Sequence, residues 1–389
     1  MIVDELRIIG STQTNVVMAA ELTRVAQRAI GQRPPAPRKQ GLGQLIYPFD
    51  RDLAWAAVTY LRTPTRVLWD VYRSRAPRLE PLYDELVAEV AGDGRPLVRD
   101  REGLSVEARR VDDFPAGERQ IVGTVKNALI DGAARRGVRL HVDPARPATR
   151  WIVRGGDGGE LVVSIDLGGG SLSQRGWRRD AGEAPLREHL AAVLLMLCRF
   201  DPRADALVDP MCGAGTIPIE ALHAARATPR PTPALAALGI ARPAAPLFPD
   251  AAPLVIGCDH DVAVLAAARD NARAAGVADE VTWQLADATR LDPGMIADIA
   301  RERGRPAPAA GLLVANPPYG ERLDAPDADL DELYAALATT CRQFTGWRAG
   351  FLVGSPDFER AFDRVLGRPR IKKPLANANL RAYFYLYEL

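Results

Sequence analysis

The sequence predicts an α/β protein in which an open parallel sheet with crossover helices follows a smaller α+β region. Two observations lead to this fold class. In the C-terminal half, short apolar runs alternate with helical patterns, which is typical of parallel strands joined by helices. In the N-terminal half, amphipathic helices and alternating strands occur without that rhythm. The length of 389 residues also exceeds one ordinary core and suits two or three domains.

The C-terminal half contains the expected sheet and its helices. Its expected strands are residues 206–210, 254–259, 281–286, 311–315, 349–353 and 380–389. Its expected helices are the segment after Gly215 and residues 262–275 and 330–344. Two proline-containing segments, residues 227–253 and 301–310, interrupt the alternation, so we expect loops or insertions on the rim of the sheet there.

The N-terminal half has a pattern of its own. Its expected helices are residues 79–90 and 117–136, and its expected strands are residues 104–110, 151–153 and 161–165. A proline-rich stretch, residues 33–39, separates the first helix from the next strand. Three glycines at 168–170 are followed by a polar, basic stretch that runs to Glu183, and we expect the domain boundary there.

Composition excludes several classes of protein. The four cysteines show no CxxC spacing and the four histidines are scattered, so we expect neither a disulfide framework nor a metal site. No apolar run approaches the roughly 18 residues that cross a bilayer, and the first ten residues lack the features of a secretion signal. We therefore expect a cytoplasmic protein without a membrane partner. The formal net charge is only +1, so any contact with nucleic acid must come from local patches.

The most informative run is Asp-Pro-Met-Cys-Gly-Ala-Gly-Thr at residues 209–216, between the first expected strand and its helix. Ligands of open α/β sheets bind outside the carboxyl ends of the strands. Gly213 and Gly215 allow a sharp turn and a close approach, and the following helix offers free N–H groups. The residues of this run that we expect at a ligand are Asp209, Met211, Cys212, Gly213, Gly215 and Thr216.

Three nucleotide-type ligands compete for this loop. A triphosphate loop needs Lys-Ser/Thr after its second glycine, which is absent, and a dinucleotide loop needs a third glycine where Pro218 stands. S-adenosylmethionine has no phosphate, so it needs no cation in the loop, but it needs acids for its ribose and adenine. Asp259 and Asp287 end the next two expected strands and suit those roles. The alternative is an ordinary strand-to-helix turn with solvated acids.

Asn316-Pro317-Pro318-Tyr319 ends the fourth expected strand of the C-terminal half. An exocyclic amine of a base is a poor nucleophile, because its lone pair is delocalised into the ring. The amide oxygen of Asn316 and the carbonyl of Pro317 can accept its two N–H groups, and Tyr319 offers a face for stacking. Catalysis would then be mostly positioning and electrostatics. Taken alone, the run could also be a proline-rich turn.

A basic, aromatic stretch, Gln-Arg-Gly-Trp-Arg-Arg at residues 174–179, precedes the catalytic region. Arginine binds phosphate and tryptophan stacks on bases, so Arg175, Trp177 and Arg178 are candidate RNA contacts. The alternative is a solvated linker whose Trp177 packs on a domain face.

The combined motifs resemble one family. SLSQRGWRRDAGEAPLREHLAAVLL at 171–195, then DPMCGAGTIPIEA and ANPPYGERL, are similar to the THUMP-domain RNA guanine-N2 methyltransferases of bacterial 23S ribosomal RNA and of tRNA. The resemblance covers roughly residue 61 to the C-terminus. It implies a ferredoxin-like piece at 1–75, a THUMP RNA-binding domain at 76–168, a linker at 169–184 and a Rossmann-like class I methyltransferase domain at 185–389.

The resemblance also implies a function. S-adenosylmethionine would be the cofactor, and N2 of a guanosine in structured RNA, 23S rRNA first, would be the target. The alternatives are a tRNA guanine-N2, DNA adenine-N6 or protein glutamine-N5 methyltransferase, or an RNA-binding factor without catalysis. The first sixty residues match the family poorly, and some relatives carry a second catalytic domain after this one. Every enzymatic alternative requires the glycine turn and the Asn316 corner to face one cleft.

Overall fold

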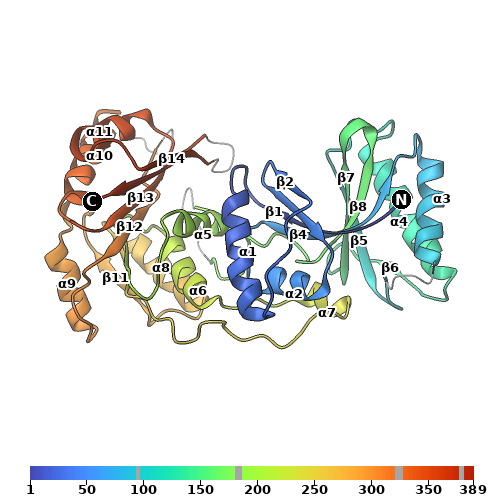
Figure 1. The fold of residues 1–389 in the computed structure, drawn as a ribbon, viewed down its shortest axis with the longest axis horizontal. Helices are drawn as coiled ribbons and strands as arrows, with labels where there is room; N and C mark the ends of the chain where they lie inside the picture. The colour runs from blue at the N-terminus through green and yellow to red at the C-terminus, as the bar shows by residue number, and fades with distance from the viewer. Residues whose placement is uncertain (93–96, 180–185, 320–326, 376–380) are drawn as a thin grey trace. The chain divides into compact units, whose positions relative to one another are not determined.

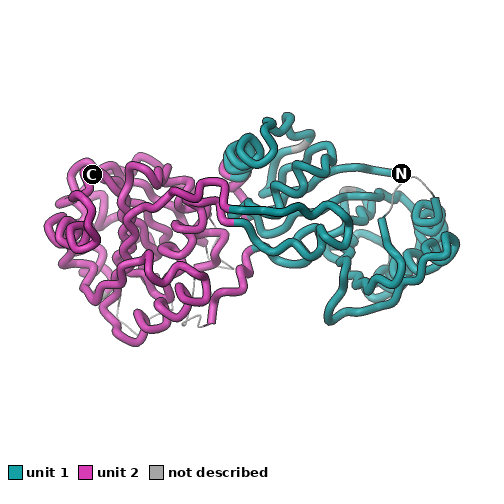
Figure 2. Tube along the Cα trace, turned by 90° about the horizontal axis from the view of Figure 1, so that it is seen from below, with its two compact units in different colours: residues 1–10, 18–172, 229–245 teal, residues 11–17, 173–228, 246–389 magenta. Residues whose placement is uncertain are grey.

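The computed structural model describes residues 1–92, 97–179, 186–319, 327–375 and 381–389. The chain forms two compact units (Figure 2). Unit 1 comprises Met1–Gly10, Met18–Leu172 and Pro229–Ala245, and unit 2 comprises Ser11–Val17, Ser173–Thr228 and Pro246–Leu389. Among the described residues, no helix combines the length and the apolar character needed to span a membrane.

Unit 2 is built on a seven-stranded sheet (Figure 1). Its strands are β9 (Ala206–Asp209), β10 (Val255–Asp259), β11 (Val281–Leu285), β12 (Gly311–Ala315), β13 (Arg348–Val353), β14 (Ile371–Pro374) and β15 (Tyr383–Glu388). They lie in the order β11-β10-β9-β12-β13-β15-β14, and the first five are parallel. β15 runs antiparallel between β13 and β14. The first strand of unit 2, β9, therefore lies in the middle of the sheet. The next strands, β10 and β11, are added on one side of it, and β12 and the later strands on the other.

Helices connect these strands as the alternating pattern predicts. They are α5 (Glu188–Leu197), α6 (Thr216–Arg226), α8 (Val262–Ala274), α9 (Pro293–Glu302), α10 (Asp327–Cys341) and α11 (Pro356–Leu366), with a short 3-10 turn η2 (Ala288–Arg290). Side-chain oxygens of Asp261, Asp292 and Ser355 accept from backbone N–H groups in the first turns of α8, α9 and α11. These caps satisfy donors that a helix start otherwise leaves unpaired.

Unit 1 contains a single eight-stranded sheet. Its strands are β1 (Ile2–Ile9), β2 (Lys39–Gly41), β3 (Gln44–Pro48), β4 (Arg66–Ser74), β5 (Gly103–Arg109), β6 (His141–Val142), β7 (Thr149–Gly155) and β8 (Leu161–Asp166). Their order is β2-β3-β1-β4-β8-β7-β5-β6, and β4 pairs antiparallel with β8. The sheet therefore runs through both N-terminal regions that the sequence separates at residue 75. A distinct THUMP domain at 76–168 stays a prediction.

Helices pack on parts of this sheet. They are α2 (Arg51–Tyr60), α3 (Leu79–Ala91), α4 (Glu118–Ala134) and α7 (Pro233–Ala237), with a 3-10 turn η1 (Asp157–Gly159). A further helix, α1 (Asn15–Ala29), lies in unit 1 from Met18 onward. α3 packs on α4, α4 on β5, and α2 on β4. Burial of Leu82 and Leu86 on α3 and of Ile121 and Val125 on α4 follows the expected helical spacing.

The structure corrects one part of the expected organisation. Residues 229–245, expected on the rim of the catalytic sheet, belong instead to unit 1, where α7 contacts β7. Hydrogen bonds hold both ends of the segment: Arg230 N donates to Thr59 O at 3.0 Å, and the Tyr60 hydroxyl donates to Ala245 O at 3.0 Å. Its composition correctly predicts an insertion between two strands of the sheet. Which unit the insertion packs against depends on residues that are distant in the sequence.

Candidate functional site

The glycine turn leaves β9 at the reversal point of the unit 2 sheet, because β9 pairs with β10 on one side and with β12 on the other. This is where open α/β sheets bind ligands. Gly213 and Gly215 have φ values of 52° and 83°, which favour glycine. A Cβ on Gly215 would lie 2.7 Å from Cη2 of Trp283. The turn therefore requires glycine at 215 for space as well as for conformation.

Three residues of the expected ligand loop support it from the inside. Asp209 is buried, and its Oδ1 accepts from the N–H of Met211 at 3.1 Å. Burial, together with the charge of Asp259, raises the pKa of Asp209 well above its usual value. Cys212 is also buried and its N–H donates to Cys258 O at 2.8 Å, while buried Thr216 accepts at Oγ1 from Arg178. Asp209, Cys212 and Thr216 thus shape the loop and are not among the residues that line the cavity.

Asp259 ends β10 and connects two loops. Its Oδ2 accepts from the N–H of Gly213 at 3.0 Å, and its Oδ1 accepts from the N–H of Asp261 at 3.1 Å. Each carboxylate oxygen keeps further acceptor capacity. The side chain can therefore position the glycine turn and still accept hydroxyl groups.

Asp287 follows β11 and is exposed. Its Oδ1 accepts from the N–H and from the hydroxyl of Thr289, at 2.8 and 2.7 Å. These hydrogen bonds lower the pKa of Asp287, so the group is an anion at neutral pH. Its acceptor character suits an amino group of a ligand.

The Asn316 corner follows β12, next to the glycine turn. Oδ1 of Asn316 is buried and accepts no hydrogen bond from the described residues. An unpaired buried acceptor is unfavourable, and it indicates a donor that arrives with a ligand. The hydroxyl of Tyr334 on α10 donates to Pro318 O at 2.6 Å and fixes the corner. The end of β12 thus combines a side-chain acceptor, Asn316 Oδ1, with a backbone that Tyr334 holds in place.

Tyr319 lies differently from the sequence expectation. Its side chain is only 2% exposed, and a Cβ on Gly354 would lie 2.8 Å from the Tyr319 ring. The ring therefore packs into unit 2 and offers no exposed face for stacking as it lies here. The reason is tertiary: Gly354, just after β13, provides the space that the ring fills.

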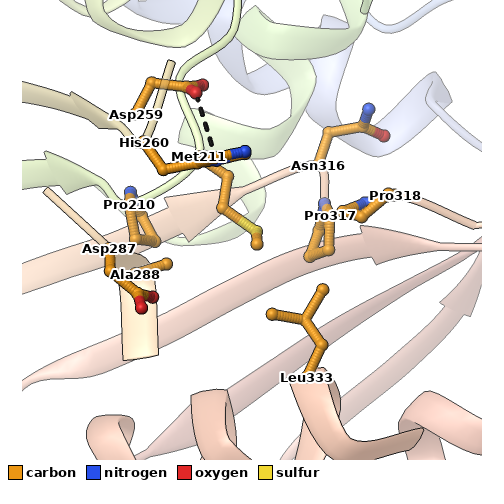
Figure 3. A pocket seen from close by; sticks show the side chains of 10 residues that line it. All are labelled: Pro210, Met211, Asp259, His260, Asp287, Ala288, Asn316, Pro317, Pro318 and Leu333. Atoms are coloured by element: carbon orange, nitrogen blue, oxygen red, sulfur yellow. Dashed lines mark ion pairs between the residues drawn. The ribbon is translucent and has the colours of Figure 1, made fainter. Parts of the chain in front are cut away.

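One cavity of about 600 Å³ brings the two corners together (Figure 3). Its lining residues are Pro210, Met211, Asp259, His260, Asp287, Ala288, Asn316, Pro317, Pro318 and Leu333. The volume is typical of a site for a small cofactor and part of a substrate. Pro210 and Met211, which begin the glycine turn, and the Asn316 corner thus face a common cleft, whereas Gly213 and Gly215 are not among its lining residues.

Several lining residues escape sequence reasoning. Pro210, His260 and Ala288 each adjoin a residue that the motifs single out, so proximity in the chain could have found them. Leu333 lies on α10 and belongs to no motif. Nor does any motif mark Asn271, whose amide donates to Ala214 O at 3.0 Å and so holds the glycine turn from α8.

Of the expected RNA contacts at 174–179, Arg175 and Trp177 are buried in unit 2 and Arg178 is 17% exposed, so the structure favours the alternative in which Trp177 packs on a domain. Arg175 is 6% exposed and its Nε contacts Oε1 of the fully buried Glu220 at 3.1 Å. Trp177 is 5% exposed within the hydrophobic core. Arg178 donates to Glu188 Oε1 at 2.9 Å and to Thr216 Oγ1 at 3.0 Å. Carboxylates elsewhere in the unit supply the counter-charges that the local sequence lacks.

In chain order from β9, the strands of unit 2 lie as 3-2-1-4-5-7-6, with the cleft at the reversal point. This sheet and its glycine turn define the Rossmann-like class I methyltransferase fold. The chain belongs to the RMKL-like methyltransferase domain family, which matches residues 175–380. Membership confirms the expectation of a methyltransferase, and S-adenosylmethionine is the cofactor of this family.

Curated relatives cover part of the chain. It is 36% identical over 269 residues to the ribosomal RNA large subunit methyltransferase K/L of Aeromonas salmonicida, which covers 60% of this chain and 35% of the relative. The same-named protein of Syntrophotalea carbinolica is 37% identical over 257 residues, with 61% and 34% covered. The chain thus spans about a third of the length of these relatives.

Solved structures share the fold over the whole chain. A "predicted N6-adenine-specific DNA methylase" from Listeria monocytogenes aligns with a TM-score of 0.76 and 22% identity, over 99% of this chain and 96% of that chain. TrmN from Thermus thermophilus aligns with a TM-score of 0.66 and 21% identity over 100% of both chains. SMU.472, solved in complex with SAH, aligns with a TM-score of 0.75 and 23% identity, over 99% and 98%. At these identities the likeness shows the fold.

Proposed function

We propose that this chain transfers a methyl group from S-adenosylmethionine to the exocyclic N2 amine of a guanosine in structured RNA, and that this RNA is 23S rRNA. The observation that carries the proposal is the single cavity lined by Asp259 and Asp287 on one side and by Asn316–Pro318 on the other. The names of the relatives, ribosomal RNA large subunit methyltransferase K/L, support RNA as the substrate. The sequence resemblance to guanine-N2 enzymes supports the target atom.

Two acids and the glycine turn would hold the cofactor. Asp259 accepts the ribose hydroxyl groups with its remaining lone pairs while it positions Gly213. The anionic Asp287 accepts from the adenine amino group. A Cβ added to Gly213 would have no neighbouring atom within 4 Å. The space beside Gly213 is therefore open, and a ligand can approach the backbone closely there. The bound cofactor supplies an electrophilic methyl group on a sulfonium.

The Asn316 corner would hold the target amine. The amide oxygen of Asn316, unpaired among the described residues, accepts one N–H, and the carbonyl of Pro317 accepts the other. Both bonds withdraw the nitrogen from conjugation and aim its lone pair at the methyl group. Because attack precedes proton loss, the site needs no strong base before the transfer, and orientation provides most of the rate.

The decisive experiment follows label from S-adenosylmethionine into RNA. Total RNA from a strain without this gene is incubated with the protein and labelled cofactor, digested and analysed by nucleoside mass. We expect N2-methylguanosine from the 23S fraction. Asn316→Ala should lower kcat about 10²- to 10³-fold, as for other lost catalytic hydrogen-bond partners. Arg301→Ala, at an arginine that is 69% exposed and outside the cavity, is the matched control and should keep full activity.

The same digest separates the alternatives. Label found in tRNA would change the substrate from rRNA to tRNA. Label found only in added DNA, as N6-methyl-2′-deoxyadenosine, would replace guanine N2 as the target. No label in any nucleic acid, with Asn316→Ala and wild type alike, contradicts catalysis on a base altogether. Cofactor binding is measured independently by calorimetry, where Asp259→Ala should lose roughly 1–3 kcal/mol of affinity.

A further inference from the structure

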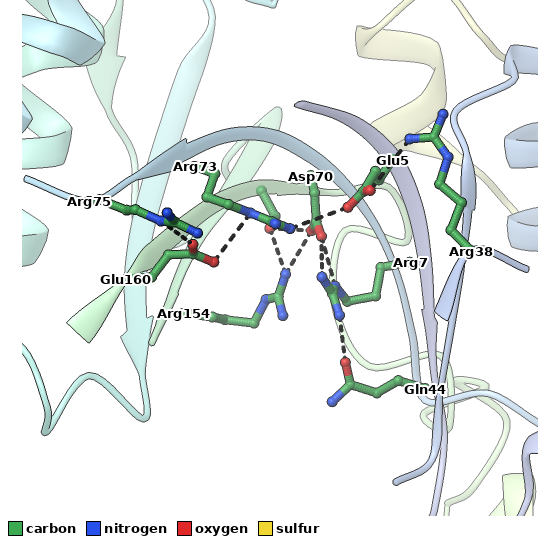
Figure 4. A network of polar contacts seen from close by, with 10 residues as sticks. Glu5, Arg7, Arg38, Gln44, Asp70, Arg73, Arg75, Arg154 and Glu160 are labelled. Carbon is green, nitrogen blue, oxygen red and sulfur yellow. Dashed lines mark hydrogen bonds and ion pairs between the residues drawn. The ribbon is translucent and has the colours of Figure 1, made fainter. Parts of the chain in front are cut away.

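A second cavity, of about 520 Å³, lies on the charged face of the unit 1 sheet (Figure 4). Five arginines from four segments line it: Arg7, Arg38, Arg73, Arg75 and Arg154. All of them belong to unit 1, so the cavity is independent of the methyltransferase cleft in unit 2. The family match begins at residue 175 and therefore does not include them.

The strand register explains why these residues meet. Asp70 on β4 lies opposite Ser164 on β8, and Arg73 lies opposite Val162. Since Ser164 and Val162 are two residues apart, they share one face of the sheet. A register shift between Asp70 and Tyr72 therefore puts Arg73 on the same face as Asp70, although the two are three residues apart. Arg154 also lies opposite Val162, from the other side, and so joins this face.

A buried carboxylate organises the floor of the cavity. Asp70 is fully buried, and its Oδ2 accepts from Arg7 Nε at 2.8 Å. Its Oδ1 accepts from Arg154 Nη2 and from Ser164 Oγ, both at 2.7 Å. Burial would raise the pKa of Asp70, but the charges of Arg154 and Arg7 outweigh it and hold the pKa below its usual value. The floor is therefore a fixed set of charges.

The arginines around this floor keep unused donors. Arg75 is 84% exposed, and among the described residues it contacts only Glu160, through Nε at 3.3 Å. The Arg38 side chain is 56% exposed, and within the described part of the chain its guanidinium pairs only with Glu5, at 3.5 Å. Arg154 donates from Nη2 to Asp70 and Ser164, but its Nε is buried and donates to no partner among the described residues. Three guanidinium groups can thus donate to a ligand.

The charges do not balance inside the cavity. The five arginines face three carboxylates, Glu5 and Glu160 in the lining and Asp70 beneath it, which leaves a formal charge of +2. Glu5 and Glu160 are each shared, since Arg73 contacts both of them at 3.5 and 3.3 Å. Burial and the like charges of Arg7 and Arg73 lower the pKa of Arg154. An anion in the cavity would relieve this repulsion.

The remaining lining indicates what kind of anion fits. Leu42, which is 85% exposed, Ile46 and Val162 add apolar surface beside the arginines. Guanidinium forks match phosphate oxygens, and a volume of about 520 Å³ exceeds what a lone carboxylate needs. We propose that this arginine cavity of unit 1 binds a phosphate group, with the sugar of the same nucleotide against Leu42 and Ile46, and that the substrate RNA supplies it.

The first test measures phosphate alone. Titration calorimetry of the full chain with inorganic phosphate at low ionic strength should detect binding, and Arg38→Glu/Arg75→Glu should weaken it at least about tenfold. Both side chains are exposed, so the variant should fold as wild type does. Arg101→Glu/Arg139→Glu is the matched control: it makes the same charge change at side chains 78% and 70% exposed, outside the cavity, and should bind as wild type does. Absence of wild-type binding, or equal loss in both variants, overturns the proposal.

The second test identifies the source of the phosphate. Adenosine monophosphate and a short single-stranded RNA are titrated in the same way, at several salt concentrations. For an RNA phosphate, Arg38→Glu/Arg75→Glu should flatten the dependence of log K on log salt by about one unit or more and raise KM for the RNA while kcat stays unchanged. A loss confined to the phosphate and monophosphate arms overturns the RNA source and leaves a free phosphate or nucleotide as the ligand.

The RNA source rests on the proposed function, but the phosphate site does not. Phosphate binding needs neither the cofactor nor turnover, so it can be scored even if no RNA is methylated. Asn316→Ala should lower the rate of methylation about 10²- to 10³-fold and leave phosphate binding unchanged. The experiments therefore distinguish a wrong proposal for RNA methylation from a wrong proposal for phosphate binding in the unit 1 cavity.

Discussion

Two groups of arginines in this molecule have opposite environments. The arginines of residues 174–179, in unit 2, are close together in the sequence, yet Arg175 is only 6% and Arg178 only 17% exposed, and each pairs with a carboxylate. The arginines of the unit 1 cavity are far apart in the sequence, yet they gather on one sheet face with an excess of charge. Clustering in the chain therefore indicates little about clustering at a surface, because distant carboxylates decide which arginines remain available.

The difference also separates two roles of the same side chain. A buried, one-to-one pair such as Arg175–Glu220 fixes structure, and breaking it leaves an uncompensated charge in the core. An exposed arginine such as Arg75 contributes little to stability and keeps its donors for a ligand. Substitutions in the two groups should therefore differ in their effects on stability and on ligand binding.

The largest effect is expected for Glu220→Gln. It leaves Arg175 buried without its counter-charge, so the free energy of unfolding should fall by about 3–5 kcal/mol. Urea unfolding of the full chain measures it. Asp270→Asn, which removes the exposed Arg273–Asp270 pair at 2.5 Å, is the control and should change stability by less than about 0.5 kcal/mol. Equal, small effects would show that the buried pair has no structural role.

A pH effect should follow at His189, which lies near the same pair. Burial, followed by the charge of Arg175, lowers the pKa of His189 to about 3. The unfolded chain takes up a proton on this imidazole near pH 6.5, whereas the folded chain does not. The stability of the fold with neutral His189 is therefore fully present above pH 6.5. It is lost as the pH falls toward 3, at up to about 1.4 kcal/mol per pH unit.

His189→Gln should remove this slope between pH 6.5 and 5. His260→Gln, at an imidazole that is 85% exposed, should keep it. Thermal unfolding of both variants across that range is the measurement. If wild type and His189→Gln lose stability in parallel, then His189 titrates normally and the buried cluster is more open than its contacts indicate.

A smaller effect is expected for Arg178→Lys. The substitution keeps the charge but loses the fork that reaches Glu188, Leu186 O and Thr216 Oγ1 together. We expect a loss of about 1–2 kcal/mol in stability and weaker cofactor binding, because Thr216 begins the helix after the glycine turn. Calorimetry and urea unfolding measure the two effects. If Arg178→Lys instead weakened RNA binding and left stability unchanged, Arg178 would be an RNA contact, as the sequence suggested.

The smallest effect on stability is expected for Arg75→Met. Its side chain is 84% exposed and, among the residues that the structure describes, it pairs only with Glu160, so the free energy of unfolding should change by less than about 0.5 kcal/mol. Phosphate binding by the same variant should nevertheless weaken. A loss of more than 1 kcal/mol in urea unfolding would make the unit 1 arginines structural and erase the contrast with unit 2.

Much of unit 2 can be read from its sequence because the signals there are local. The apolar runs located β9, β10, β11, β12 and β13 to within a residue or two. A parallel strand that is buried on both faces is a nearly continuous apolar run, so it can be recognised from its own residues. The order of the strands follows from general rules for crossover connections. Residues 320–326 and 376–380, which include the start of the last expected strand, lie outside the described residues.

Sequence alone determined which residue types end each central strand: glycines after β9, acids after β10 and β11, and Asn-Pro-Pro after β12. Their convergence follows, because parallel strands present their carboxyl ends at one edge. Only the tertiary structure decided that Tyr319 packs against Gly354, that Trp177 joins the core, and that arginines of unit 1 line a cavity. Burial and counter-charge come from partners distant in the chain, and a local pattern carries no information about them.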